Sequence, residues 1–169
     1  MADRFATSIK IGGAISNKTL RGLATAIRDN QFGFIWGDEL SGTESTDEVV
    51  LALRQEIEKQ DGKLVCVNIQ CAEESLSDFC REHNLPYCKS VEGRYEFNGE
   101  IRWWVPGMEE EAFSDADAEG SYAMISVDKV IEFIEENFDE NDPGFTLNLL
   151  LAELHEKHPP EIMRLMPCE

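Results

Sequence analysis

Residues 95–104 read Tyr-Glu-Phe-Asn-Gly-Glu-Ile-Arg-Trp-Trp and carry the clearest structural signal in the chain. Asn-Gly is the favoured pair for the type I′ turn of a two-residue hairpin, because both central residues must adopt positive φ. The alternation around Asn98 and Gly99 therefore predicts a tight hairpin with bulky side chains on both faces. One face is expected to enter the core. Trp103 and Trp104 are candidates for a partner-binding patch, because exposed tryptophan is enriched at binding hot spots.

The stretch that follows this ribbon is densely acidic. From Trp103 to Asp142 the chain holds thirteen acidic residues against one basic residue, Lys129. Residues 1–70 carry ten acidic and eight basic residues, whereas residues 71–169 carry twenty-four and seven, within a total net charge of −19. This charge argues against direct binding of nucleic acid or of an anionic membrane. It favours a basic protein partner or divalent cations, and the asymmetry places the functional surface in the second half.

The length of 169 residues and the hydrophobic content of 42% favour one soluble domain spanning residues 1–169. The N-terminus lacks the pattern of a secretory signal, and no apolar run reaches the ~18 residues that span a bilayer. We therefore expect a cytoplasmic protein with no cofactor. In a reducing compartment most of its five cysteines should be free thiols.

Strand and helix patterns alternate along the chain, which predicts an α/β domain, with α+β as the alternative. We expect a single mixed sheet of five to seven strands with about five helices. Two strand–helix–strand units, beginning near Ile9 and Leu64, form a faint internal repeat. Residues 108–120 are expected to be a loop, Ser126 and Thr146 to cap the last two helices, and residues 161–166 to add a helical turn.

Three segments resemble parts of known sites. Asp115, Asp117 and Glu119, with Gly120, match the first half of a calcium loop, but Ser126 stands where a bidentate glutamate is needed. A possible zinc or thiol site is formed by Cys66, Cys71, Cys80, His83 and Cys88, which can equally be buried apolar cysteines. The Gly12-Gly13 turn opens a helix in the manner of a phosphate-binding loop, or is a simple turn before an N-cap.

These observations favour a non-enzymatic interaction protein whose acidic face binds a basic partner. A dense row of carboxylates can imitate the charge spacing of a nucleic-acid backbone. In composition and charge the chain resembles the DNA-mimicking inhibitors of phages and plasmids, including anti-restriction and anti-CRISPR proteins. That resemblance implies a partner with a basic nucleic-acid-binding groove. The alternative is a small enzyme or ligand-binding protein with a pocket near Gly12, Gly13 and Cys71. The predicted partner-binding residues are Trp103, Trp104, Glu109, Glu110, Glu111, Asp115, Asp117, Glu119, Glu132, Glu135, Glu136, Asp139 and Glu140.

Overall fold

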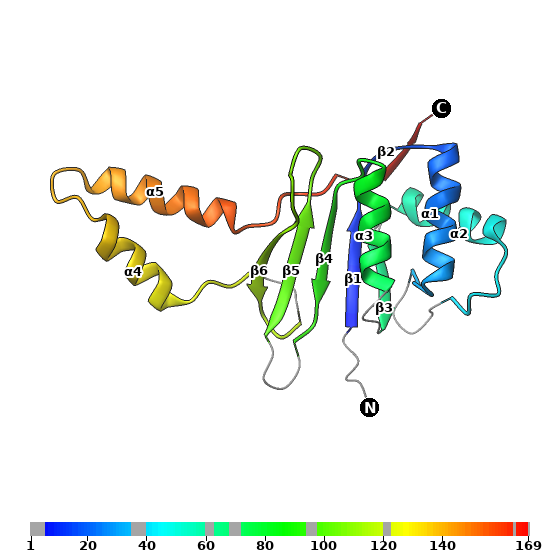
Figure 1. The fold of residues 1–169 in the computed structure, drawn as a ribbon, viewed down its shortest axis with the longest axis horizontal. Helices are drawn as coiled ribbons and strands as arrows, with labels where there is room; N and C mark the ends of the chain where they lie inside the picture. Colours follow the sequence, from blue (N-terminus) through cyan, green and yellow to red (C-terminus); the bar gives the residue numbers. More distant parts are fainter. Residues whose placement is uncertain are drawn as a thin grey trace.

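The computed structural model describes residues 6–34, 40–59, 63–67, 72–93, 98–119, 123–163 and 165–168. In this part of the chain, five helices and seven strands form an α/β body from which one pair of helices projects (Figure 1). The predicted α/β class is confirmed. The strands are divided between two sheets instead of sharing one.

The main sheet has five strands in the order β3-β1-β4-β5-β6, and every neighbouring pair is antiparallel. Its strands are β1 (Ala6–Ile11), β3 (Lys63–Val67), β4 (Tyr87–Val91), β5 (Gly99–Trp104) and β6 (Ala112–Ala116). Because β3 and β4 both pair antiparallel with β1, they run parallel to each other on either side of it. The helix α3 (Ala72–Glu82) joins them, so the second predicted strand–helix–strand unit is present, with β1 inserted between its two strands.

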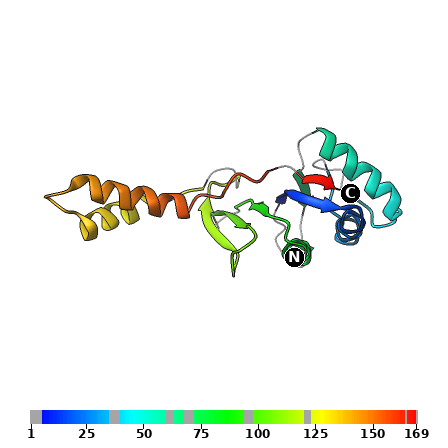
Figure 2. The same ribbon diagram turned by 90° about the horizontal axis from the view of Figure 1, so that it is seen from above.

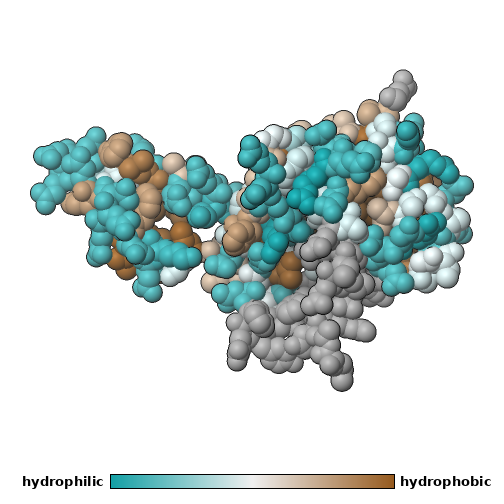
Figure 3. Space-filling view, in the orientation of Figure 1, coloured by the Kyte–Doolittle hydropathy of each residue, from teal (hydrophilic) through white to brown (hydrophobic). Residues whose placement is uncertain are grey.

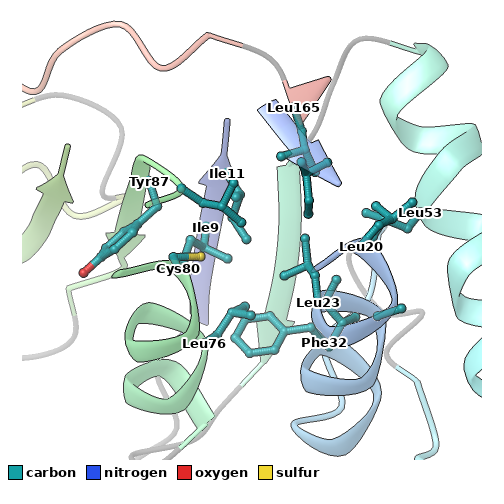
Figure 4. Close-up of a cluster of buried hydrophobic side chains, with 14 of the residues drawn as sticks. Ile9, Ile11, Leu20, Leu23, Phe32, Leu53, Leu76, Cys80, Tyr87 and Leu165 are labelled. Carbon is teal, nitrogen blue, oxygen red and sulfur yellow. The ribbon is translucent and has the colours of Figure 1, made fainter. Parts of the chain in front are cut away.

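One face of this sheet is covered by α1 (Asn17–Asp29) and α3, while α2 (Thr46–Lys59) packs against α1 (Figures 1 and 2). Each helix follows the 3.6-residue period, since its buried side chains recur every three or four positions. Figure 4 shows that Leu23 and Leu76, from α1 and α3, lie on either side of Phe32, which is only 1% exposed. The core therefore holds the three helices rigidly on the sheet.

A second, parallel sheet pairs β2 (Gly13–Ser16) with β7 (Leu165–Cys168). The prediction of a helical turn over residues 161–166 is therefore wrong, because Leu165 and Met166 are extended and pair with β2. The buried side chains of Ile162 and Leu165 anchor this last segment. The C-terminal strand thus joins the body beside the first strands of the chain.

The helices α4 (Val127–Asn137) and α5 (Pro143–Glu156) form an antiparallel hairpin that points away from the body beyond β6 (Figures 1 and 2). We call residues 126–158 the arm. Ser126 caps α4 as predicted, accepting a hydrogen bond from the Asp128 amide, whereas Asp142 and not Thr146 caps α5. None of the helices in the described ranges is both long enough and apolar enough to cross a membrane.

The predicted Asn-Gly hairpin is wrong. Gly99 is the first residue of β5 and pairs with Ala116, while Glu100 pairs with Val91 on one side and Asp115 on the other. Both edges of β5 are therefore occupied, one by β4 and the other by β6. The predicted partner residues 95–97 lie outside the described residues. Residues 112–116, predicted to be loop, supply the other neighbour.

Candidate interaction surface

The predicted acidic residues do not form one contiguous face. Glu109 and Glu110 lie exposed in the turn before β6, and Glu119 lies exposed beyond its other end. The two turns are at opposite ends of the strand (Figure 1), and the acidic residues of the arm project away from both. The structure therefore divides the predicted site between the ends of β6 and the arm.

Glu111 is not a surface carboxylate. One of its oxygens, Oε1, lies 2.9 Å from Lys89 Nζ and accepts a 2.8 Å hydrogen bond from the Tyr87 hydroxyl. The other, Oε2, lies 3.4 Å from Arg102 Nη1. The side chains of Lys89 and Glu111 are 5% and 14% exposed, so the pair is largely withdrawn from water. Predicting Glu111 as a partner-binding residue was therefore wrong: it is the counterion of a buried lysine.

This network is held between the sheet and α3. The buried Ser77 hydroxyl of α3 accepts a hydrogen bond of 3.3 Å from Lys89 Nζ. Burial, followed by the hydrogen bond to Glu111, raises the pKa of Tyr87 well above its usual range. The phenol therefore stays protonated and donates to the carboxylate at neutral pH. These contacts tie the start of β6 to β4 and to α3, which is a structural role.

Trp103 and Trp104 do not form a binding patch either. They are 4% and 6% exposed, and they point to opposite faces of β5. Trp104 packs in the main core near Tyr87, and its indole Nε1 donates a 3.0 Å hydrogen bond to the Met108 carbonyl. Trp103 fills a second cluster on the far face with Ile101. Both faces of this strand are therefore covered, Trp104 by the main core and Trp103 by the second cluster.

Within the described ranges, the arm carries a row of exposed acidic side chains. On α4, exposed carboxylates are spaced so that they share one flank of the helix: Asp128, Glu132, Glu135 and Glu136. No ion pair joins any of these four to a basic side chain of the described ranges. Near the tip of the arm, Glu140 and Asp142 are also exposed. A basic surface could approach this flank without displacing any contact of the protein itself.

Apolar side chains are exposed on the same arm. At 3.6 residues per turn, Val127, Ile131, Ile134 and Phe138 share one stripe of α4, and their exposure runs from 37% to 72%. Leu147 and Leu151 form the corresponding stripe of α5, at 56% and 44%.

No residue of α4 is buried, and in α5 only Thr146 is. The space-filling view shows hydrophobic atoms gathered on the arm among hydrophilic ones (Figure 3). The 3.6-residue period of the sequence also places these α4 side chains on one face of a helix. The structure leaves it uncovered.

The joint of the arm is specified by Thr146. Its hydroxyl donates to the Asn137 carbonyl at 2.9 Å and accepts from the Asp139 amide at 3.1 Å. Asp142 then accepts a 3.1 Å hydrogen bond from the Phe145 amide at the start of α5. These bonds satisfy backbone groups at the end of one helix and the start of the next. These hydrogen bonds therefore fix the turn between α4 and α5.

An open hollow of about 210 Å³ lies where the arm meets β6. It borders Phe113, Ser114, Asp115, Met124, Ile125, Lys129 and Lys157. Lys129 and Lys157 are the two lysines between residues 123 and 163. Both lysines therefore lie at the base of the arm, and residues 130–137 of α4 carry no basic side chain that would offset its carboxylates.

The calcium-loop reading is wrong for this fold. Asp115 and Ala116 belong to β6 and pair with Glu100 and Gly99, so the segment is strand and not a helix–loop–helix turn. Among the described residues, no group of three or more histidine, cysteine, aspartate or glutamate side chains is placed to hold a metal ion.

The cysteines are separated by the sheet. Cys80 packs in the main core, whereas Cys88 lies beside the cluster of Trp103 on the opposite face. Cys71 lies outside the described residues, as does the side chain of Cys66. The ring of His83 is tilted against that of Phe79, with 4.4 Å between the ring centroids. Cys80 and Cys88 therefore cannot ligate one ion together.

Burial raises the pKa of Cys80 from 9.0 to about 12. Because the folded state holds this proton more tightly than the unfolded state, its stabilising contribution is complete below pH 9 and is lost as the pH rises toward 12. We expect the unfolding free energy of the wild type to fall more steeply over this range than that of Cys80→Ala. Urea unfolding at a series of pH values measures both slopes, and equal slopes would show that Cys80 ionises freely in the folded protein.

The Gly12-Gly13 turn is filled by the protein itself. A Cβ on Gly12 would lie 1.8 Å from the Met163 carbonyl oxygen, and one on Gly13 would lie 3.0 Å from Pro86. The Gly12 amide already donates to the Pro86 carbonyl at 2.9 Å. Glycine is needed here for close backbone packing, and no ligand fits between Gly12 and the Met163 carbonyl; Cys71, the third residue of the predicted pocket, lies outside the described residues.

Comparisons with models of protein families, with curated proteins and with solved structures found no match to this chain.

Proposed function

We propose that the protein is a non-enzymatic interaction protein that presents the acidic flank of its arm to a basic partner. The observation that carries this proposal is the row of exposed carboxylates on α4, held away from the body and free of ion pairs within the described residues. Glutamine has nearly the same helix propensity as glutamate, so helix stability alone does not require the charges of Glu132, Glu135 and Glu136. The net charge of −19 would add long-range attraction to a basic partner and speed its association.

The spacing of the row supports a partner that binds nucleic acid. From Asp128 to Glu136 the helix rises ~1.5 Å per residue, so its four carboxylates span about 12 Å of the axis, at uneven rises of about 6, 4.5 and 1.5 Å and a mean of about 4 Å. A strand of duplex DNA presents one charge every ~3.4 Å. The arm is therefore proposed to occupy a lysine- and arginine-lined groove, in the manner of the mimicking inhibitors that the composition resembles. Glu109, Glu110, Asp117 and Glu119 remain candidates for secondary contacts.

Neutralising the flank tests this proposal. The triple variant Glu132→Gln, Glu135→Gln and Glu136→Gln should bind the partner recovered from source cells at least about tenfold more weakly than wild type. Asp128 is kept, since a negative charge near the N-terminus of α4 stabilises the helix. Thermal unfolding should show an intact fold. Wild-type binding should also weaken as salt rises.

The matched control removes three exposed carboxylates from the body: Glu58→Gln, Glu82→Gln and Glu161→Gln. It changes the net charge by the same amount, so binding should fall little. An equal loss of affinity in both variants would mean that only the net charge matters, and would contradict the assignment of the binding surface to the arm. Affinity unchanged between low and high salt would contradict the electrostatic mechanism itself.

A further inference from the structure

The arm is too thin to be a complete packing unit. Two helices joined by one joint bury no side chain of α4 and only Thr146 of α5. Most helical stability in proteins comes from packing an amphipathic face, and isolated helices of this length are marginal in water. The apolar stripes of α4 and α5 therefore need cover that the described residues of this chain do not supply.

The two stripes face the same way. In α4, the exposed stripe lies about 100° further round the helix than Val130 and Phe133, which are partly buried. In α5, Leu147 and Leu151 are displaced in the same sense from the buried Thr146. Because the helices are antiparallel, equal displacements bring both stripes to one side of the hairpin. They form a single apolar face, which we call the seam: Val127, Ile131, Ile134, Phe138, Leu147 and Leu151.

We infer that the seam binds the seam of a second copy of this chain, so that two arms form an antiparallel four-helix bundle. Two-helix hairpins complete a bundle core when their apolar faces meet, and a two-fold axis makes one face serve both partners. At about half exposure each, the six side chains contribute on the order of 500 Å² of apolar surface. A polar rim brings this near the ~800 Å² per partner of a standard interface.

The charge pattern permits this pairing. Residues 143–152 of α5 carry no charged side chain, while the carboxylates of α4 lie to one side of its apolar stripe. Packing α4 of one copy against α5 of the other therefore sets an acidic helix beside an uncharged one. Like charges are kept apart, and both acidic flanks remain on the outside. This inference concerns a different flank of α4 from the proposed partner surface and does not depend on it.

Sedimentation equilibrium of the full chain tests the inference. Wild type should behave as a dimer of the 19.1 kDa chain at micromolar concentration. Ile131→Ser with Leu151→Ser should raise the dimer dissociation constant at least about 100-fold, because each removes a large side chain from the centre of the seam. Leu51→Ser is the matched control: Leu51 is 59% exposed on α2, and its loss should leave the dimer intact.

Salt separates this dimer from the proposed basic partner. Screening relieves repulsion between two acidic chains, so rising salt should strengthen the dimer, whereas it weakens binding to a basic groove. A folded monomer at all concentrations overturns the inference, as does a seam variant that remains dimeric or a control variant that dissociates. Circular dichroism of each variant, compared with wild type, confirms that the helices are retained. If the double variant loses helix, the same comparison with Ile131→Ala, which keeps a helix-forming residue, must still show a weakened dimer.

Discussion

Replacing Glu111 by Gln should lower the free energy of unfolding by about 3–5 kcal/mol, because removing one partner of a buried ion pair is strongly destabilising. Lys89 Nζ, with its side chain 5% exposed, would lose the carboxylate 2.9 Å away. The Tyr87 hydroxyl would keep an amide oxygen as acceptor. Urea unfolding followed by tryptophan fluorescence measures the change, since Trp104 stacks near Tyr87.

The neighbouring substitution Glu110→Gln is the control. Glu110 is exposed, so its change should stay within about 0.5 kcal/mol. Combining Lys89→Met with Glu111→Gln should recover part of the loss, because an apolar side chain then replaces the buried lysine. Equal effects at positions 110 and 111, or a double variant no better than Glu111→Gln, would mean that the pair is not buried in the folded protein.

Gly12→Ala should destabilise the protein by at least about 2–3 kcal/mol, the size expected when a tight contact is overpacked. Its Cβ would lie 1.8 Å from the Met163 carbonyl and 2.7 Å from Ile162 Cγ2, so the segment leading to β7 must move. Amide exchange of Leu165–Cys168 should accelerate together with the loss of stability. Thermal unfolding and hydrogen exchange report the two effects.

Gly144→Ala provides the comparison. Gly144 lies in the first turn of α5, where an added Cβ meets only Asp142 Oδ1, at 3.3 Å. Alanine favours a helix over glycine by up to ~1 kcal/mol, so this change should be neutral or slightly stabilising. If Gly12→Ala were equally harmless, the C-terminal segment would not be packed against this turn, and a ligand pocket there would become possible again.

Local chemistry in the sequence predicted local structure well. The Ser45 and Glu48 capping box is present: the Ser45 amide donates to Glu48 Oε2 at 2.8 Å, and the Glu48 amide donates to Ser45 Oγ at 3.3 Å. Ser126 caps its helix as predicted, and Ser16 caps α1. The hydrogen bonds of a helix cap join residues within about four positions of one another, so the local sequence is enough to predict them.

Pairing partners were harder to predict because they depend on distant residues. Asn98 and Gly99 form a strong hairpin signal, yet β5 is paired on both sides by strands that lie elsewhere in the chain. A tertiary arrangement that satisfies two strand edges outweighs the preference of one dipeptide. The low apolar content of residues 112–116 hid β6, whose inward positions are filled by Ala112, Ser114 and Ala116.

The candidate site was only partly visible in the sequence. Acidic residues at positions 109–111 look equivalent, but Glu111 alone faces the buried Lys89. Lys89 could have indicated this role. It shares one face of its strand with Tyr87 and Val91, and a lysine buried among such residues needs a counterion. The apolar period of α4 was recognised, but periodicity does not reveal whether a face meets its own domain or another chain.

Competition with nucleic acid tests most directly the proposal that the arm occupies a nucleic-acid-binding groove. The partner recovered with the wild-type protein is loaded with a fluorescently labelled duplex, and the protein is titrated in at fixed salt. We expect wild type and the body-neutralised control to displace the duplex, while the variant neutralised at Glu132, Glu135 and Glu136 should require at least about ten times more protein. A duplex that stays bound alongside the protein, or equal displacement by both neutralised variants, would show that the arm does not occupy the groove.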